Sequence, residues 1–414
     1  MKPLPFEDLK VIDLSTVLAG PSVGTFFAEL GARVIKIEHP SHGDVTNTWR
    51  LRQESDLSQQ SAYYSSVNYK KELVKLNLGL EADYHIFLNE IKDADILLMN
   101  FKKGDDQKLK VTPSVLWEIN PGLVIGKISG FGSENDRIAY DLILQAESGF
   151  MAMNGTPDSG PVKMPVALID VLAAHQLKEG LLLALLQREQ GKGQVVSVSL
   201  YDAAICSLAN QASNYLMAQQ VPQRIGSLHP NIAPYGEIFE TQDGQLLTFA
   251  IGSDQHFEKL VSYLDLHKLA KDPRFSSNIE RVKNREVLYH YMASVISMKT
   301  CAHIISSLLE LGVPVAKIKS LEEVFEDPKA MSLVKTEQID GQNTKRVSQI
   351  AFKFEAWFAL HKRPENGNTT TNCAMISCAH PGGSPSEANK PQMKKYTNTF
   401  LILTTPIRFL ALDV

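Results

Sequence analysis

Short apolar runs alternate with helical patterns over the first third of the chain, and this alternation constrains the fold more than any other feature. The expected strands are residues 9–14, 33–38, 74–78, 94–100 and 123–129, with expected helices at 22–30 and 81–92. Strands that alternate with helices form a parallel sheet with helices on both faces. Ligands of such sheets bind beyond the carboxyl ends of the strands. The segments to examine for function are therefore residues 17–21, 38–42, 100–104 and 129–132.

Length and composition bound the class of protein. A chain of 414 residues is expected to hold two or three domains. Its net charge of −4 gives no basic surface for nucleic acid. Because it has no signal sequence and no apolar run of about 18 residues, we expect a cytoplasmic protein that does not interact with membranes. Four cysteines in so long a chain are not a disulfide framework.

The loop after the first expected strand lacks a nucleotide-binding motif. Its A-G-P-S-V-G sequence (residues 19–24) has the wrong spacing for a G-x-G-x-x-G turn and contains a proline. No G-x-x-x-x-G-K-[ST] sequence occurs either. Gly20 and Pro21 are typical of a tight turn with proline at the first position of a helix. This interpretation holds whatever else the loop binds.

Asp170 stands out in the long segment 137–193, because it closes the apolar run 166–169 and opens a helical pattern. A carboxylate at that position has two possible roles. It can cap the helix by accepting hydrogen bonds from free backbone N–H groups. It can also be a nucleophile, kept ionised by the positive end of the helix dipole. Taken alone, these residues favour the cap.

Several sequence blocks, in order and at consistent separations, resemble the class III CoA-transferase family, which includes the formyl-CoA transferases. The blocks are L-K-V-I-D-L-S-T-V-L-A-G-P (9–21), L-G-A-R-V-I-K-I-E-H-P-S-H-G-D (30–44), A-D-I-L-L-M-N-F-K-K-G (94–104), the segment 137–203 and H-P-N-I-A-P-Y-G-E-I-F (229–239). The resemblance covers residues 7–350. It implies a Rossmann-like α/β large domain, a smaller α+β domain and an interlocked homodimer.

The resemblance also implies a reaction and a site. Coenzyme A would be a co-substrate rather than a bound cofactor, exchanged between an acyl-CoA and a small carboxylic acid, with Asp170 as the catalytic aspartate. The positions that match CoA-contacting residues of the family are Val17, Leu18, Ala19, His39, Leu76, Asn77, Asn100, Phe101, Lys102, Lys108, Ala139 and Tyr140.

Two of these positions depart from the formyl-CoA transferases. His39 replaces an arginine, so a phosphate contact there would depend on pH. Leu18 replaces a glutamine that serves formyl and oxalyl chemistry, which argues against formate or oxalate as a substrate. With the blocks taken together, Asp170 becomes the expected nucleophile, and the backbone N–H groups at its helix start are expected to stabilise an oxyanion.

Two alternatives remain open. The α-methylacyl-CoA racemase branch of the family uses a histidine as one of its proton-transfer groups, and Tyr140 replaces it here; a tyrosine with a pKa near 10 is a poor base at neutral pH. A non-catalytic CoA-binding homologue is the other alternative. Asp141 is expected either to orient the reacting groups or to cap the helix that follows it. His175 is interpreted as a packing residue, and no metal-ligand spacing is present.

The remaining chain is expected to divide at changes in pattern. The expected parts are a large CoA-binding domain (1–205), a linker helix (206–225), a small domain (226–325), a return towards the large domain (326–354) and an atypical tail (355–414). Residues 252–255 match a family loop that closes over the acyl group. The tail is polar and loop-like, and we expect it not to adopt the family's C-terminal structure.

Overall fold

The computed structural model describes residues 4–54, 60–188, 191–339 and 342–353. The chain divides into two compact units, Met1–Phe352 and Lys353–Val414. The predicted tail of residues 355–414 lies outside the described residues. All the elements described below belong to the first unit.

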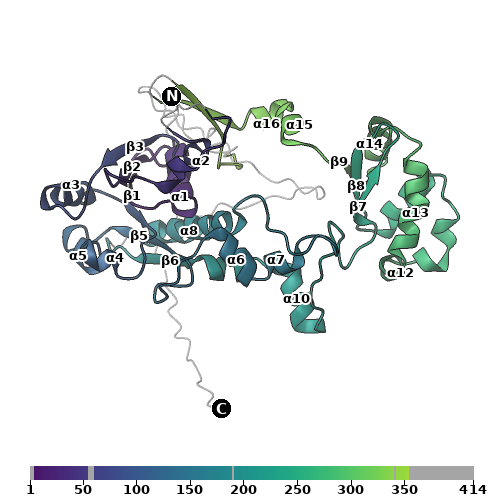
Figure 1. The fold of residues 1–414 in the computed structure, drawn as a ribbon, viewed down its shortest axis with the longest axis horizontal. Coiled ribbons are helices and arrows are strands. Elements are labelled where there is room, and N and C mark those ends of the chain that lie inside the picture. The colour runs from purple at the N-terminus through teal and green to yellow at the C-terminus, as the bar shows by residue number, and fades with distance from the viewer. Residues whose placement is uncertain (1–3, 55–59, 189–190, 340–341, 354–414) are drawn as a thin grey trace, which may run out of the picture. The chain divides into compact units, whose positions relative to one another are not determined.

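A six-stranded parallel sheet forms the centre of the N-terminal half, in the order β3-β2-β1-β4-β5-β6 (Figure 1). Every pair of neighbours is parallel. This is the doubly wound order, in which the strand sequence reverses between β1 and β4. The strands are β1 (Lys10–Asp13), β2 (Arg33–Glu38), β3 (Lys71–Lys75), β4 (Ile96–Met99), β5 (Val124–Ser129) and β6 (Val195–Ser199).

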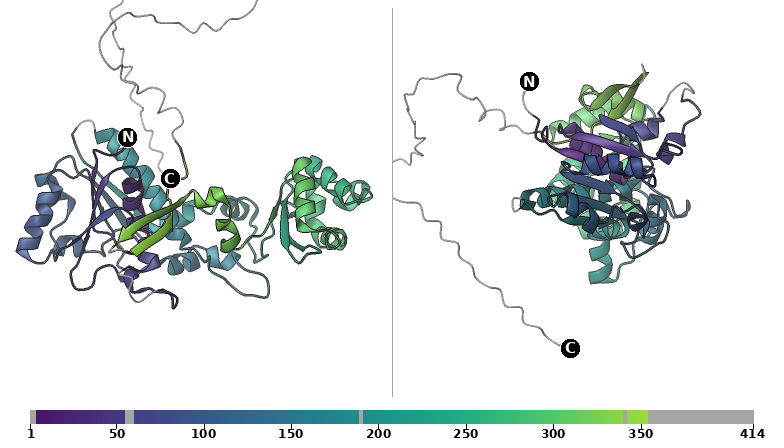
Figure 2. Two further views of the ribbon diagram at one scale, coloured as in Figure 1. Left: turned by 90° about the horizontal axis from the view of Figure 1, so that it is seen from above. Right: turned by 90° about the vertical axis from the view of Figure 1, so that its left-hand side faces the viewer.

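Helices cover both faces of the sheet (Figure 2), and alternate residues of the strands fill two separate cores, one on each face. Val11 faces a core built with α1 (Ala19–Glu29), α8 (Leu168–Gln187) and α9 (Leu200–Cys206). The next residue, Ile12, faces a core built with α3 (Glu81–Ile91) and α5 (Pro113–Ile119). Side chains of a strand alternate between its faces, so a sheet covered on both sides needs these continuous apolar runs.

The predicted parallel sheet is confirmed, with two errors in its strands. Residues 74–78 were expected as a strand, but β3 ends at Lys75. Leu76 and Asn77 therefore lie in the turn beyond the strand, where the Leu76 N–H donates to the Glu38 carbonyl at 3.0 Å. β6 was not predicted, because its V-V-S-V-S sequence is short and half polar.

Short helices fill the connections around the carboxyl ends of the strands and lead away from the sheet. They are η1 (Val45–Thr48), α2 (Ala62–Ser65), α4 (Asp105–Lys108), α6 (Asp141–Glu147), α7 (Phe150–Met153) and α10 (Ala209–Ala218).

Residues 235–317 form a three-stranded antiparallel sheet, β7-β8-β9, with helices and a hydrophobic core of its own. Its elements are β7 (Tyr235–Glu240), β8 (Leu246–Ala250), α11 (Asp254–Tyr263), η3 (Leu269–Lys271), η4 (Pro273–Phe275), α12 (Asn278–Lys283), α13 (Arg285–Ile296), α14 (Cys301–Glu310) and β9 (Val315–Lys317). In the described ranges no single helix is long and apolar enough to cross a bilayer; one pair, α13 with α14, passes that test only together and is bent by 111°.

The chain then returns to the large sheet through α15 (Leu321–Phe325), α16 (Pro328–Met331) and the hairpin β10 (Val334–Ile339) and β11 (Gln342–Val347). Glu29, at the end of α1, holds this return segment. Its carboxylate accepts hydrogen bonds from the Arg346 guanidinium at 2.5 Å, the Ser348 hydroxyl at 2.5 Å and the Gln349 N–H at 3.0 Å. Residues far apart in sequence are thereby joined through one buried carboxylate.

Candidate functional site

The loop between β1 and α1 (residues 14–18, the β1–α1 loop) has an unusual backbone. Val17 has a φ of +74°, in the left-handed region that a β-branched residue adopts only under strain. Such a conformation costs on the order of 1–3 kcal/mol and persists only where neighbouring groups impose it. The close approach of the loop to α1 also needs glycine at position 20, in the first turn of that helix, since a Cβ there would lie 2.3 Å from the Cβ of Ser15.

Side chains from two other strand ends hold the loop in this conformation. Asp44, after β2, accepts the Val17 N–H at 3.1 and 3.3 Å. Asn100, after β4, accepts the Thr16 N–H at 3.0 Å and donates its amide to the Thr16 carbonyl at 2.9 Å. The carboxyl ends of β1, β2 and β4 are thus linked by direct hydrogen bonds.

A network of buried charges lies behind the loop. Lys36 and Asp44 form an ion pair at 3.5 Å, and both side chains are fully buried. Lys71 pairs with Asp13 at 2.8 Å. Burial lowers the pKa of Lys71 to about 8, so this amine remains protonated at neutral pH. Burial raises the pKa of Asp13, but the charges of Lys71 and Lys36 outweigh it and hold that pKa below its usual value.

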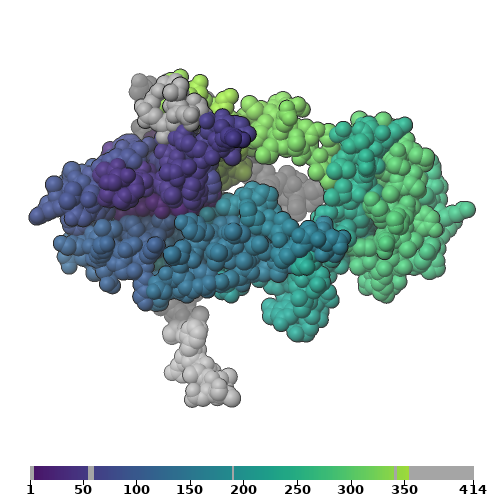
Figure 3. Space-filling model, in the orientation of Figure 1, coloured from purple at the N-terminus to yellow at the C-terminus, as the bar shows by residue number. Residues whose placement is uncertain are grey.

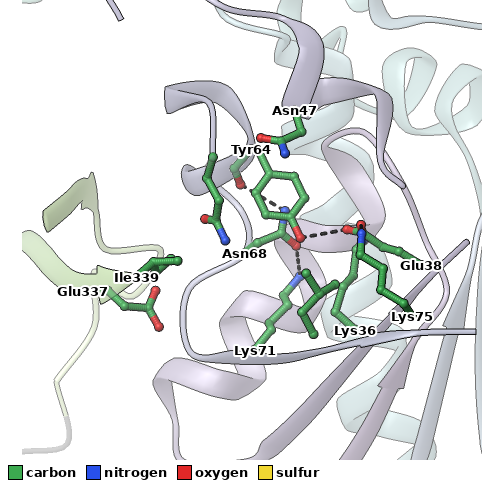
Figure 4. Close-up of a pocket in the computed structure, with 11 residues that line it drawn as sticks. Lys36, Glu38, Asn47, Tyr64, Asn68, Lys71, Lys75, Glu337 and Ile339 are labelled. Carbon is green, nitrogen blue, oxygen red and sulfur yellow. Dashed lines mark hydrogen bonds and ion pairs between the residues drawn. The ribbon is translucent and has the colours of Figure 1, made fainter. Parts of the chain in front are cut away.

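A polar cavity of about 360 Å³ adjoins this network (Figure 4). Three lysines line it, and each has an oxygen partner: Lys75 binds Glu38 at 2.7 Å, while Lys36 and Lys71 belong to the network described above. Tyr64 donates its hydroxyl to Glu38 at 2.7 Å. Asp170 is not among the residues that line this cavity.

Asp170 lies in the first turn of α8 and is only 7% exposed. Among the described residues, none forms a hydrogen bond or ion pair with its carboxylate. Burial, and then the charge of Asp141, raises the pKa of Asp170 to about 7. A carboxyl group with a pKa near neutrality and no partner is typical of reactive sites rather than of structural ones.

Asp141, the first residue of α6, holds the start of α8. Its Oδ1 accepts the N–H groups of Ile169 at 2.7 Å and of Asp170 at 3.4 Å. Its Oδ2 accepts the amide of Gln145 at 2.5 Å, and Gln145 in turn accepts the Met164 N–H at 2.8 Å. Asp141 was expected to orient the reacting groups or to cap the helix that follows it; its Oδ1 instead binds the start of α8, the helix that carries Asp170.

Tyr63 and Trp49 form an aromatic pair that the sequence did not predict. Their rings make an edge contact with centroids 5.2 Å apart. Tyr63 is close enough to feel the charge of Asp170, since burial and then the charges of Asp170, Asp141 and Asp44 raise the pKa of Tyr63 to about 12. Both lie between β2 and β3, where the sequence has no periodic pattern that would have placed them.

The other predicted residues occupy the same edge of the sheet or its neighbouring loops. His39 follows β2 and stacks on His42 at 3.9 Å. Phe101 follows β4 and packs on the second core, while Lys102 and Lys108 are exposed nearby in sequence. Ala139 packs against Gly130, and Tyr140 is 50% exposed. In the described part of the chain, no group of His, Cys, Asp or Glu side chains is arranged to hold a metal ion.

Three expectations about Asp170 are wrong in detail. It does not cap α8: the helix begins at Leu168, and Asp141 accepts the hydrogen bonds that a cap would take. Its pKa is raised rather than lowered, because burial and then the charge of Asp141 disfavour the ionised carboxylate. The N–H groups of residues 169–171 are bonded to Asp141 and to the Ala167 carbonyl, so they are not free to stabilise an oxyanion.

The doubly wound sheet, with a buried carboxyl group beside it, defines an α/β protein of the class in which ligands bind beyond the strand ends. The chain belongs to CoA-transferase family III, whose model matches residues 6–370. It is therefore an acyl-CoA:carboxylate CoA-transferase, which moves CoA between acyl groups. The match extends past residue 350, the end of the resemblance described above.

Curated relatives align over most of the chain. An acetyl-CoA:oxalate CoA-transferase of Acetobacter aceti is 36% identical over 78% of this chain and 83% of its own. A succinate–glutarate CoA-transferase of Agrobacterium fabrum is 32% identical over 79% and 83%. Among solved structures, a CAIB/BAIF family protein from Brucella suis is similar, with a TM-score of 0.73 and 33% identity over 86% of this chain and 93% of that one.

Proposed function

We propose that Asp170 is the covalent nucleophile of CoA exchange. The observation that carries this proposal is a buried carboxyl group without a partner, in the first turn of α8, whose backbone another acidic side chain fixes in place. Such a group has lost the hydrogen bonds of water and gained none from the protein. Its basicity is therefore raised, and a more basic carboxylate is a better nucleophile towards a thioester.

The exchange proceeds through two anhydrides and one thioester on Asp170. The carboxylate attacks the donor thioester carbonyl, the C–S bond breaks, and a mixed anhydride and CoA thiolate result. The thiolate attacks the aspartyl carbonyl, releasing the donor acid as its carboxylate and leaving an aspartyl-CoA thioester. The acceptor carboxylate attacks that thioester, and the released thiolate then attacks the acceptor carbonyl of the new anhydride. No net proton or redox change occurs, and Asp170 is regenerated.

CoA is proposed to lie along the carboxyl ends of the strands. The β1–α1 loop with Ala19, the turn at Leu76 and Asn77, and Asn100 with Phe101 surround that edge, where doubly wound sheets bind ligands. Lys102 and Lys108 supply exposed positive charges for the phosphates, and His39 is proposed to add a further phosphate contact. Ala139 and Tyr140 precede Asp141 directly, which supports their place beside the thioester.

The acceptor is proposed to be a small carboxylic acid. The relatives are named for oxalate, glutarate, succinate and mesaconate, which are all small dicarboxylic acids. The nonpolar side chain of Leu18 argues against oxalate, and this prediction can be tested directly by comparing oxalate with glutarate. A panel of both acids with acetyl-CoA and succinyl-CoA as donors would rank them by kcat/KM.

We also propose that the chain divides into the five parts given above. A further proposal is that two chains form an interlocked homodimer. Support comes from α10, which has no buried residue and stands out from the surface (Figure 3). Leu216 is 71% and Met217 is 88% exposed, an apolar pair that a second copy would cover. Light scattering should give a dimer, and a double Leu216→Asp, Met217→Asp variant should give a monomer.

The experiment that tests the nucleophile compares wild-type protein with Asp170→Ala. Exchange of labelled CoA between an acyl-CoA and free acid should fall by at least about 10³-fold, while CoA still binds, since covalent catalysis is lost but the binding groups remain. The same incubation in D₂O distinguishes the racemase alternative. Deuterium at the α-carbon, with exchange activity unaffected by the substitution, would rule the proposal out.

A further inference from the structure

The H-P-S-H-G-D sequence after β2 ends in Asp44, a residue to which neither the sequence nor the proposed reaction gives a role. Its side chain is fully buried, so it does not contact a ligand in solution. Four of its hydrogen bonds are with backbone or hydroxyl groups: two with the Val17 N–H, and two with the N–H and hydroxyl of Thr46, at 3.0 and 2.8 Å.

Asp44 is joined to the β1–α1 loop in a second way. The Lys36 amine pairs with Asp44 and also donates to the Ser15 carbonyl. The carboxylate therefore contacts Val17 directly, and its counter-ion contacts the same loop two residues earlier. Loss of the Asp44 charge would leave a buried ammonium group without a carboxylate partner, next to the loop.

The Asp44 carboxylate contacts Val17, which is the strained residue of the loop. Val17 needs an external group to keep its left-handed backbone, and its N–H points at the Asp44 carboxylate. Leu18 follows and is the N-cap of α1, although no side chain caps that helix. The start of α1 is thus set by the loop conformation rather than by a capping side chain.

We propose that Asp44 is a positioning residue that holds Val17 in its left-handed conformation and so presets the loop for CoA. The inference rests on the proposed role of Val17, Leu18 and Ala19 in binding CoA. Asp44 acts on CoA only through the loop. A network formed before binding lets CoA meet a loop that is already ordered, which avoids the entropy cost of ordering it.

Two substitutions separate positioning from general stability. Asp44→Asn keeps an oxygen for the Val17 N–H but removes the charge that pairs with Lys36. Val17→Gly removes the steric penalty of the left-handed backbone, because glycine adopts it readily. Glu72→Gln is the matched control, since Glu72 forms an exposed ion pair with Arg33 at the start of β2, away from the loop.

The readouts are CoA affinity by calorimetry, kinetic constants with acyl-CoA, and hydrogen exchange of residues 14–19. Asp44→Asn should weaken CoA binding about tenfold, raise KM more than it lowers kcat, and speed amide exchange at Val17. In a Val17→Gly background the effect of Asp44→Asn should be smaller, because less strain remains to be held. Glu72→Gln should leave all three readouts unchanged.

The outcomes distinguish the inference from the proposed function. If CoA does not slow exchange of residues 14–19 in the wild-type protein, the loop does not bind CoA and the proposed site fails. If CoA protects the loop but Asp44→Asn leaves affinity and Val17 exchange unchanged, the positioning role is overturned. Equal losses of CoA affinity in the wild-type and Val17→Gly backgrounds, accompanied by a lower melting temperature, would also overturn it, since that is the pattern of a purely structural residue.

Discussion

Asp141 Oδ1 accepts the backbone N–H of Asp170, at 3.4 Å, while its negative charge helps to raise the pKa of the Asp170 side chain to about 7. One carboxylate thus fixes the backbone of another and increases its basicity. Both effects act on a residue in the first turn of α8, where a helix dipole alone would have lowered the pKa. The two effects can be separated by substitution, because an amide keeps the acceptor and loses the charge.

Asp141→Asn should shift the acid limb of the pH profile to lower pH. In the wild-type protein, kcat/KM should rise with pH through about 7 as Asp170 ionises. The asparagine oxygen still accepts the Ile169 N–H, but the nearby negative charge is gone, so the pKa of Asp170 should fall. Rate measurements from pH 5 to 9 test this. An acid limb that does not move would mean that Asp141 does not act on Asp170 by charge.

Asp170→Asn should stabilise the protein at pH 8 more than at pH 5. The folded pKa of about 7 lies above the unfolded value of 3.8, so the folded state binds the proton more tightly. Stability therefore falls as pH rises from about 4 to about 7, and the neutral amide escapes that loss. The gain should be about 1–3 kcal/mol larger at pH 8, measured by urea unfolding. A pH-independent effect would contradict the raised pKa.

Arg281→Ala should strongly destabilise residues 235–317, which form the three-stranded antiparallel sheet and its helices. This arginine is 1% exposed and donates to the carbonyls of Ala233 and Phe275, at 3.0 and 3.2 Å, and to Asp254 at 2.6 Å. Its loss would leave those carbonyls unpaired, at about 2–4 kcal/mol. Thermal unfolding measures the change. Lys283→Ala, two residues away and exposed, is the control, and equal effects of both would refute the assignment.

Glu29→Gln should loosen the return segment. The carboxylate accepts three hydrogen bonds from residues 346–349, and its ion pair with Arg346 is only 3–4% exposed at both side chains. Those bonds outweigh burial and hold the pKa of Glu29 below its usual value. Removing the charge should cost about 1–3 kcal/mol and speed amide exchange in β11 and residues 348–350. Unchanged amide exchange in β11 and residues 348–350 would mean that Glu29 does not hold the return segment.

The hydrophobic pattern predicted the sheet well, because strands that are buried on both faces appear in the sequence as continuous apolar runs. β2 was placed to the residue, and β6 was missed because alternating serines hide a short strand. The alternation of strands and helices predicted the parallel sheet with helices on both faces, while the Rossmann-like large domain was implied by the family resemblance. A smaller α+β domain was also implied by the resemblance, and the bounds of the domains remain predictions.

The site was harder to predict, because its important contacts join residues far apart in sequence. Asp170 was found by its place before a helical pattern, but its helix starts two residues earlier. That error hid the fact that its cap comes from Asp141, in another helix. Tyr63 and Asp44 carry no local signal, since only the folded chain brings them to Asp170 and Val17.

The measurement that tests the central claim most directly is mass spectrometry of the protein after incubation with acyl-CoA and hydroxylamine. An aspartyl thioester or anhydride reacts with hydroxylamine to form a stable hydroxamate on the protein. Peptide mapping should find that hydroxamate on Asp170, dependent on acyl-CoA and absent from Asp170→Asn. Turnover of CoA exchange with no modification of Asp170, or with the modification on another residue, would contradict covalent catalysis by Asp170.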